Sequence, residues 1–128
     1  MSQLSDYAEN ALFNALLRNV AFTSPTTVYV ALFTTNPTDA GSGTEVSVGN
    51  YVRQPVTFGA PSNGVGSNSG QVTWDPASVA FGTITHVGLY DAATSGNLLM
   101  HAALAASKVI GAGDIFRISI GSLVATFA

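Results

Sequence analysis

Two histidines, His86 and His101, are the side chains best suited to chemistry, and both lie inside apolar runs of the sequence. A Ser-His-Asp set could be assembled around them, but the sequence contains no G-x-S-x-G nucleophile motif. A metal site built on the two histidines would need at least one more ligand, and Asp75 and Asp91 are the nearby candidates. We therefore predict that both histidines are structural, packed with their nitrogens hydrogen-bonded, and we predict no catalytic residue and no metal site.

Four of the seven acidic residues stand beside Gly, Pro or Ala at predicted turns: Asp39, Asp75, Asp91 and Asp114. Aspartate stabilises turns by accepting hydrogen bonds from nearby backbone N–H groups. A pair of carboxylates that cleaves a glycoside must face each other across about 5–10 Å, and the turn role explains these residues without such a pair. We predict that the protein is not an enzyme and uses no cofactor.

Phosphate-bearing partners are also not expected. The segment GVGSNSG at residues 64–70 lacks the lysine of a phosphate-binding loop and is not followed by a predicted helix. The four basic residues, Arg18, Arg53, Lys108 and Arg117, are scattered, and the formal net charge is −3. Such a chain cannot neutralise a run of phosphates, so we predict no binding of nucleic acid.

The composition points to a subunit of an assembly. Charged residues make up 9% of the 128-residue chain, whereas globular domains average about 25%. A lone soluble domain needs more charge than this to stay apart from its neighbours. No apolar run approaches the ~18 residues of a membrane span, and the N-terminus lacks the pattern of a signal peptide. We expect one domain over residues 1–128, made in the cytoplasm and without a membrane partner.

Residues 5–18 form the one predicted helix. Ser5 can cap it, and Asp6 and Glu9 suit the positive end of the helix dipole. Its apolar face is much wider than the ~100° typical of a surface helix. We expect this amphipathic helix to contact both its own sheet and a partner subunit; the alternative is that a small domain simply buries most of its only helix. The candidate interface residues are Tyr7, Phe13, Leu17 and Val20.

Two apolar runs, residues 84–90 and 98–104, are predicted to pair as a central hairpin, with residues 91–97 as the loop. Because the runs would be antiparallel, the two histidines could be cross-strand neighbours. Each run is apolar on both faces, with Val87 and Leu89 opposite Ile84 and Tyr90. We therefore expect both faces to be covered, either by other layers of the domain or by a neighbouring subunit.

Further strands are predicted on both sides of this hairpin. Pro55 makes the strand in residues 51–58 an edge strand or a broken one, and Gly121 is a probable bulge near the C-terminus. Residues 36–43 and 59–70 are predicted loops. The remaining strands are expected at residues 27–34, 71–75, 115–120 and 123–127. This order, without helical crossovers, predicts a mainly β fold: an antiparallel β-sandwich, jelly-roll-like, with one N-terminal helix.

Three segments carry a resemblance to a known family: LSDYAENALFNALLRN, VYVALFTTNPTDAGSGTEV and ITHVGLYDAATSGNLLMHAALAASKVIGAGDIFRISIGSL. They are similar to small virion structural proteins of tailed bacteriophages. Such proteins are often labelled tail fibre proteins, and similar chains serve as capsid decoration or cement proteins. The resemblance covers most of the chain and is weakest over residues 59–70. It implies a non-enzymatic component of the virion, made in the cytoplasm of a host bacterium.

The leading hypothesis is a cement protein that sits over junctions of the major capsid protein as a symmetric homo-oligomer, such as a trimer. It is favoured because the sequence shows neither the heptads nor the fibrous repeats of a fibre shaft. One rival is a tail fibre or tail-tip protein that reads the host surface with residues 36–43 and 59–70. The other is a small hydrolase of the cell envelope, which would need His86 or His101 at an exposed cleft.

Overall fold

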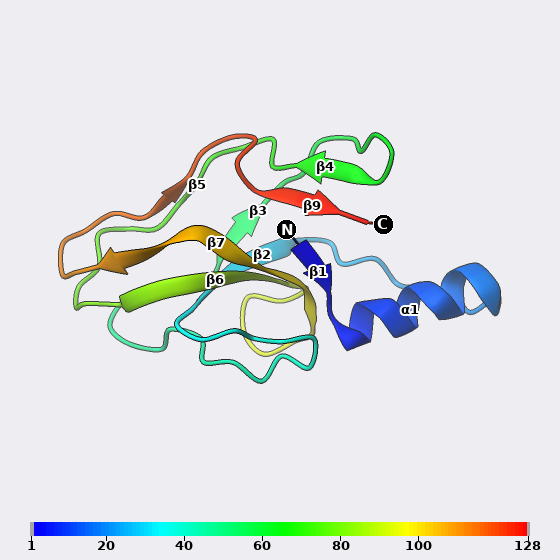
Figure 1. The fold of residues 1–128 in the computed structure, drawn as a ribbon, viewed down its shortest axis with the longest axis horizontal. Coiled ribbons are helices and arrows are strands. Elements are labelled where there is room, and N and C mark those ends of the chain that lie inside the picture. Colours follow the sequence, from blue (N-terminus) through cyan, green and yellow to red (C-terminus); the bar gives the residue numbers. More distant parts are fainter. Residues whose placement is uncertain (1, 128) are drawn as a thin grey trace.

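The protein is mainly antiparallel β-structure with one N-terminal helix, as the sequence predicts (Figure 1). The structure is a computed structural model and describes residues 2–127. Its elements, in order, are β1 (Ser2–Leu4), α1 (Asp6–Leu17), β2 (Val28–Phe33), β3 (Gln54–Val56), β4 (Val65–Ser67), β5 (Val72–Thr73), β6 (Gly82–Tyr90), β7 (Leu98–Ile110), β8 (Arg117–Ile118) and β9 (Val124–Thr126).

The predicted hairpin, β6 and β7, forms the centre of a five-stranded sheet with the order β1-β7-β6-β2-β3. All pairs in this sheet are antiparallel, and Gly88 lies opposite His101 across the hairpin. Strand β3, which contains Pro55, is at the edge of the sheet, where a missing backbone donor is tolerated. Strand β1 at the other edge was not predicted, because three residues with one apolar side chain carry little signal.

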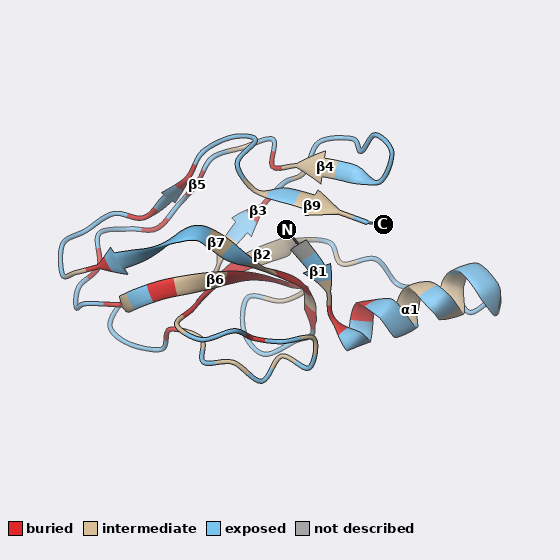
Figure 2. Ribbon diagram, in the orientation of Figure 1, coloured by how far each residue is buried: buried red, intermediate tan, exposed pale blue. Residues whose placement is uncertain are grey.

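A second layer covers one face of this sheet. It consists of two short ribbons, β4 with β9 and β5 with β8, and the main core lies between the layers (Figure 2). Trp74 is 2% exposed, packs against Phe116 with ring centroids 5.4 Å apart, and donates its indole N–H to the Val52 carbonyl oxygen at 2.8 Å. The sheet contributes Val30, Leu32, Ile84, Val87, Leu89 and Met100 to this core.

The opposite face of the sheet is covered by the long connection between β2 and β3. A smaller cluster of Ala31, Phe33, Tyr90 and Leu98 is buried there. The Arg53 guanidinium lies 3.6 Å from the centre of the Tyr90 ring and bonds to the Ala92 and Ser95 carbonyl oxygens of the hairpin loop. This chain itself therefore covers both faces of the hairpin near its loop, whereas residues 105–109 of β7 are exposed.

One predicted orientation in the hairpin is wrong. Ile84 was expected on the same face as Tyr90, but it packs in the main core with Val87 and Leu89. Strand β6 is irregular at this point, where its pairing with β7 shifts register: Ile84 lies opposite Lys108, whereas His86 lies opposite Ala103. Such an irregularity changes the face to which the side chains on either side of it point.

The Gly- and Ser-rich residues 59–70, predicted to be a loop, contain strand β4, which pairs with β9. Asn68 is 1% exposed and fixes the connection by donating to the Gly70 and Ser119 carbonyl oxygens and accepting from the Leu123 amide. The predicted bulge at Gly121 is also incorrect. Gly121 lies in a turn closed by the Ser122 amide and the Ser119 carbonyl oxygen, 3.0 Å apart, and the strands on either side pair with different partners.

The helix begins and ends within one residue of its predicted limits. Ser5 is the N-cap and accepts a hydrogen bond from the Ala8 amide, and Arg18 is the C-cap. The alternative that a small domain buries most of its only helix is wrong, because Ala8 is its one buried residue. The helix starts directly from edge strand β1 and projects away from the β-layers, so only its first turns lie near the sheet (Figures 1 and 2).

Candidate functional site

The projecting helix carries an exposed apolar face. The four predicted interface residues are all exposed: Tyr7 40%, Phe13 57%, Leu17 71% and Val20 44%. Leu16, which we did not select, is the most exposed of the helix's large apolar side chains at 77%. The sequence shows that Leu16 is apolar, but not that it lies on the outer side of the helix.

These residues do not form one patch. An α-helix turns about 100° per residue, so Phe13, Leu16 and Leu17 lie together on one side. Tyr7 and Val20 instead line a shallow hollow beside the helix, together with Phe22. We call Phe13, Leu16 and Leu17 the outer face of α1.

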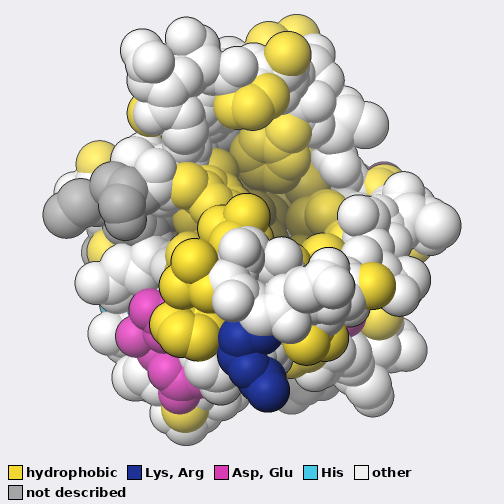
Figure 3. Space-filling model, turned by 90° about the vertical axis from the view of Figure 1, so that its right-hand side faces the viewer, with side chains coloured by type: hydrophobic (Ala, Val, Ile, Leu, Met, Phe, Trp, Pro, Cys, Tyr) yellow, Lys and Arg dark blue, Asp and Glu magenta, His cyan; other side chains and the backbone are white. Residues whose placement is uncertain are grey.

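An apolar groove of about 540 Å³ lies on the opposite side of the helix. Figure 3 looks at the molecule from the side on which α1 projects and shows a hollow lined by hydrophobic side chains. Its walls come from α1, β7, the segment around β4, and β9. The lining includes Ala8, Ala11 and Leu12 of the helix, and Phe22, Val28, Phe58, Pro61, Leu99 and Phe127 of the body.

Glycines hold the wall of this groove in place. Gly64 has a φ of +77°, and a Cβ there would lie 2.4 Å from the Phe127 carbonyl oxygen. The Phe127 amide donates to the Gly64 carbonyl oxygen at 2.8 Å, which fixes the C-terminal strand against the β4 segment. Because only glycine adopts this conformation at such close approach without strain, the Gly-rich composition has a structural reason.

The base of the helix is fixed by polar contacts. The Ser5 amide donates to the Leu99 carbonyl oxygen and the Asp6 amide to the Asp39 carbonyl oxygen, both at 2.9 Å, and the Ser5 hydroxyl donates to the Leu98 carbonyl oxygen. Because Ser5 is 1% exposed and its hydroxyl serves as a cap, it is a structural residue rather than a nucleophile. These contacts fix where the helix starts and in which direction it leaves the sheet.

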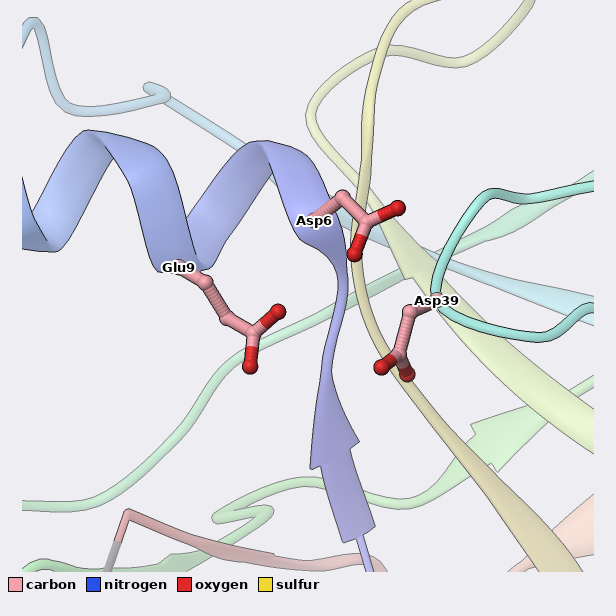
Figure 4. Close-up of side chains that lie close together, drawn as sticks. All are labelled: Asp6, Glu9 and Asp39. Carbon is pink, nitrogen blue, oxygen red and sulfur yellow. The ribbon is translucent and has the colours of Figure 1, made fainter.

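Three carboxylates, Asp6, Glu9 and Asp39, gather beside this point, with oxygen atoms within 4.8 Å of one another (Figure 4). Asp6 and Glu9 lie in the first turn of the helix, where negative charge is stabilised by the helix dipole. Asp39 is held by His101. Such exposed oxygens could accept a cation, but no other feature of residues 2–127 points to a bound ion.

The histidines have structural contacts. His101 is 4% exposed, and its Nε2 lies 2.8 Å from Asp39 Oδ1; His86 Nδ1 lies 2.8 Å from the Thr85 hydroxyl. They lie diagonally across the hairpin rather than directly opposite each other. Partial burial, and then the nearby His101, lower the pKa of His86.

The aspartates only partly follow the prediction. Asp91 accepts from the Asn97 backbone amide at 2.7 Å and Asp114 accepts from the Gly111 amide at 2.7 Å, so both stabilise turns. Asp39 instead bonds to His101, which is 62 residues away in the sequence. Neither Asp75 nor Asp91, the candidates for a third ligand had the histidines bound a metal, forms a described hydrogen bond to a histidine. Sequence spacing alone did not indicate Asp39.

Comparison with known proteins agrees with the resemblance seen in the sequence. Residues 3–126 match the model of a family described as podophage GP4 fiber I protein gp80. No curated protein matches the chain. In the described part of the chain, no helix is long and apolar enough to cross a membrane. Because the match spans nearly the whole sequence, the chain belongs to this podophage GP4 fiber I protein gp80 family, and it is a structural protein of a phage virion.

Proposed function

We propose that the protein is a non-enzymatic subunit of a tail fibre that assembles with identical copies and with other virion proteins through α1 and the groove. The observation that carries this proposal is the exposure of Leu16 and Leu17, 77% and 71%, at the projecting end of the helix. The largest exposed apolar patch of a soluble domain is often a functional contact surface. The family description supports the fibre as the place of assembly.

The polar groups support a structural role. The imidazole of His101 is buried against Asp39, and the Ser5 hydroxyl is bonded to the backbone, so neither is presented to a substrate. The apolar groove lacks the convergent polar groups of a typical active site. These contacts favour assembly over catalysis.

Residues 36–43 are the remaining candidate for contact with a host surface. Of the two loops considered for that role, residues 59–70 contribute Gly59, Pro61, Gly64 and Gly66 to the wall of the groove. We therefore assign residues 59–70 to assembly. The turn at residues 36–43 lies outside the groove.

A capsid decoration protein is the second candidate. It is favoured by the compact β-domain and by the length of α1, 12 residues, which is too short for a coiled-coil shaft. In this role, the outer face of α1 and the groove would contact the major capsid protein and neighbouring copies at subunit junctions.

Mass spectrometry of separated heads and tails from purified virions tests the two candidates. A fibre subunit is expected in the tail fraction, at a copy number that is a multiple of the fibre number. Cryo-electron microscopy of the same particles would place it directly. Detection only in heads would refute the fibre proposal and support the decoration protein.

A further inference from the structure

We propose that the outer face of α1 docks into the apolar groove of a second copy of this chain, so that identical subunits join head to tail. This inference rests on the proposed structural role and names the partner of the site. It commits to one contact: Phe13, Leu16 and Leu17 of one subunit enter the groove between α1 and β9 of the next.

The positions of the two surfaces favour this arrangement. The groove is lined by Ala8, Ala11 and Leu12 of α1, whereas the outer face is centred on the other side of the same helix, with Leu12 and Leu16 at the border between them. One subunit can therefore receive a neighbour on one side of its helix and contact another on the other side. Two different patches that meet in this way form a heterologous interface, which closes into a ring or continues as a filament.

The projection of the helix makes the contact accessible. Leu16 and Leu17 lie in its last turn, which extends beyond the β-layers (Figure 1). The polar contacts of Ser5 and Asp6 hold the other end on the sheet. A helix fixed at its base and free at its tip can enter a neighbour without unfolding, so little conformational freedom is lost on assembly.

A single contact of this kind is smaller than a typical stable interface. At roughly 200 Å² for a large apolar side chain, exposures of 57%, 77% and 71% leave about 400 Å² of apolar surface on the outer face. The groove wall that it covers adds a similar area, giving about 800 Å² before any rim is counted, against about 1,200 Å² for a small stable interface. A subunit in a closed ring makes two such contacts, which favours a ring over an isolated pair.

The first test is the mass of the purified full chain and its variants, measured by size-exclusion chromatography with light scattering. We expect an oligomer for the wild type and at least about a hundred-fold weaker association for Leu16→Asp/Leu17→Asp. The matched control is Val109→Asp/Ile120→Asp, which adds the same two charges at sites 67% and 65% exposed and outside the groove lining. Circular dichroism verifies that each variant is folded. A monomeric wild type, or equal loss in the control, overturns the inference.

A groove variant distinguishes head-to-tail docking from helix–helix pairing. A Cβ at Gly66 would meet its nearest neighbours at 3.7–3.9 Å, so Gly66→Leu can fill the groove without steric overlap at the Cβ. It should also weaken self-association. Mixed with Leu16→Asp/Leu17→Asp, it should form a heterodimer, because one variant keeps its helix and the other keeps its groove. If the mixture stays monomeric, docking of the helix into the groove is refuted.

Cross-linking supplies an independent readout, because the chain contains no cysteine. Leu17→Cys and Pro61→Cys chains are mixed and oxidised, and a disulfide forms only where their Cα atoms come within about 7 Å. We expect the mixed disulfide to dominate. Predominant Leu17→Cys self-linkage would indicate helix–helix pairing and overturn the inference. If the protein is monomeric but is found in tail fractions, the docking inference fails and the fibre proposal stands. If it is an oligomer found only in heads, the fibre proposal fails and the docking inference stands.

Discussion

Removing the Glu45 carboxylate should strongly destabilise the fold. Glu45 binds Arg53 through two hydrogen bonds, at 2.9 and 3.0 Å, and accepts another from the Tyr51 hydroxyl at 2.7 Å. The Arg53 side chain is 8% exposed and that of Glu45 is 24% exposed, so the pair is largely removed from water. Burial alone would lower the pKa of Arg53, but the bonds to Glu45 outweigh it and raise that pKa.

The expected loss for Glu45→Ala follows from the charge left behind. Breaking a buried ion pair by removing one partner costs about 3–5 kcal/mol. Partial exposure of Glu45 reduces the cost, and Arg53 keeps its bonds to the Ala92 and Ser95 carbonyl oxygens. We therefore expect a decrease of about 3 kcal/mol in the free energy of unfolding, out of a typical total of about 5–15 kcal/mol.

Urea denaturation followed by the fluorescence of Trp74, the one tryptophan and 2% exposed, measures this free energy. Glu45→Gln is the matched control: it keeps the shape and an acceptor oxygen, so about 1–2 kcal/mol should be lost. Because removal of both charges leaves none unpaired, Glu45→Leu/Arg53→Met should lose less than the sum of its single variants. All variants are compared at one protein concentration, because self-association would shift the transition. Additive losses, or a loss below about 1 kcal/mol for Glu45→Ala, would refute the reasoning.

Three further perturbations have defined outcomes. At Gly88 a Cβ would lie 2.9 Å from the side chains of both Leu98 and Phe33, so Gly88→Ala should lower the free energy of unfolding by about 1–3 kcal/mol in urea denaturation. Gly59→Ala is the control and should be nearly neutral, because its nearest contact would be at 3.9 Å. Asn68→Ala leaves buried backbone groups unpaired and should cost about 2–3 kcal/mol in the same assay, with faster amide exchange around β9 as a second sign. Because the folded pKa of His86 is lowered from 6.5, the unfolded chain binds more protons near that pH, and stability should fall as the pH drops through and below 6.5. His86→Gln should reduce this slope in melting temperatures measured across that range; an unchanged slope would assign the dependence to other groups.

Local patterns were enough for the elements whose causes are local. The central hairpin follows from its β-branched and aromatic runs, the start of α1 from the Ser5 cap, and the edge position of β3 from Pro55. Each depends on residues next to each other in the chain. The same information predicted the turns at Asp91 and Asp114, where the side chain bonds to a backbone amide a few residues away.

The groove could not be predicted, because it is made of segments far apart in the sequence. Strand β4 is a strand only because β9 pairs with it, and its Gly- and Ser-rich sequence gives no sign of that partner. The irregular pairing at Ile84, which packs in the main core, likewise depends on the partner strand β7 and on packing. For α1, composition showed an unusually wide apolar face but could not decide what covers it. The structure shows that this domain leaves the outer face of α1 exposed.

The attachment of α1 to the sheet explains how its apolar outer face can remain exposed. A helix usually packs because its apolar face is buried, yet here its position is set by backbone and capping bonds from Ser5 and Asp6 to Leu98, Leu99 and Asp39. Those bonds do not depend on burial of the outer face, so that face can remain apolar and exposed while the helix stays in place. The low charge of the chain, 9%, fits the proposed assembly, because a surface covered by identical subunits would not need charge to keep it apart from them. An apolar helix face that stays exposed because the helix is held at its base is what the proposed assembly requires.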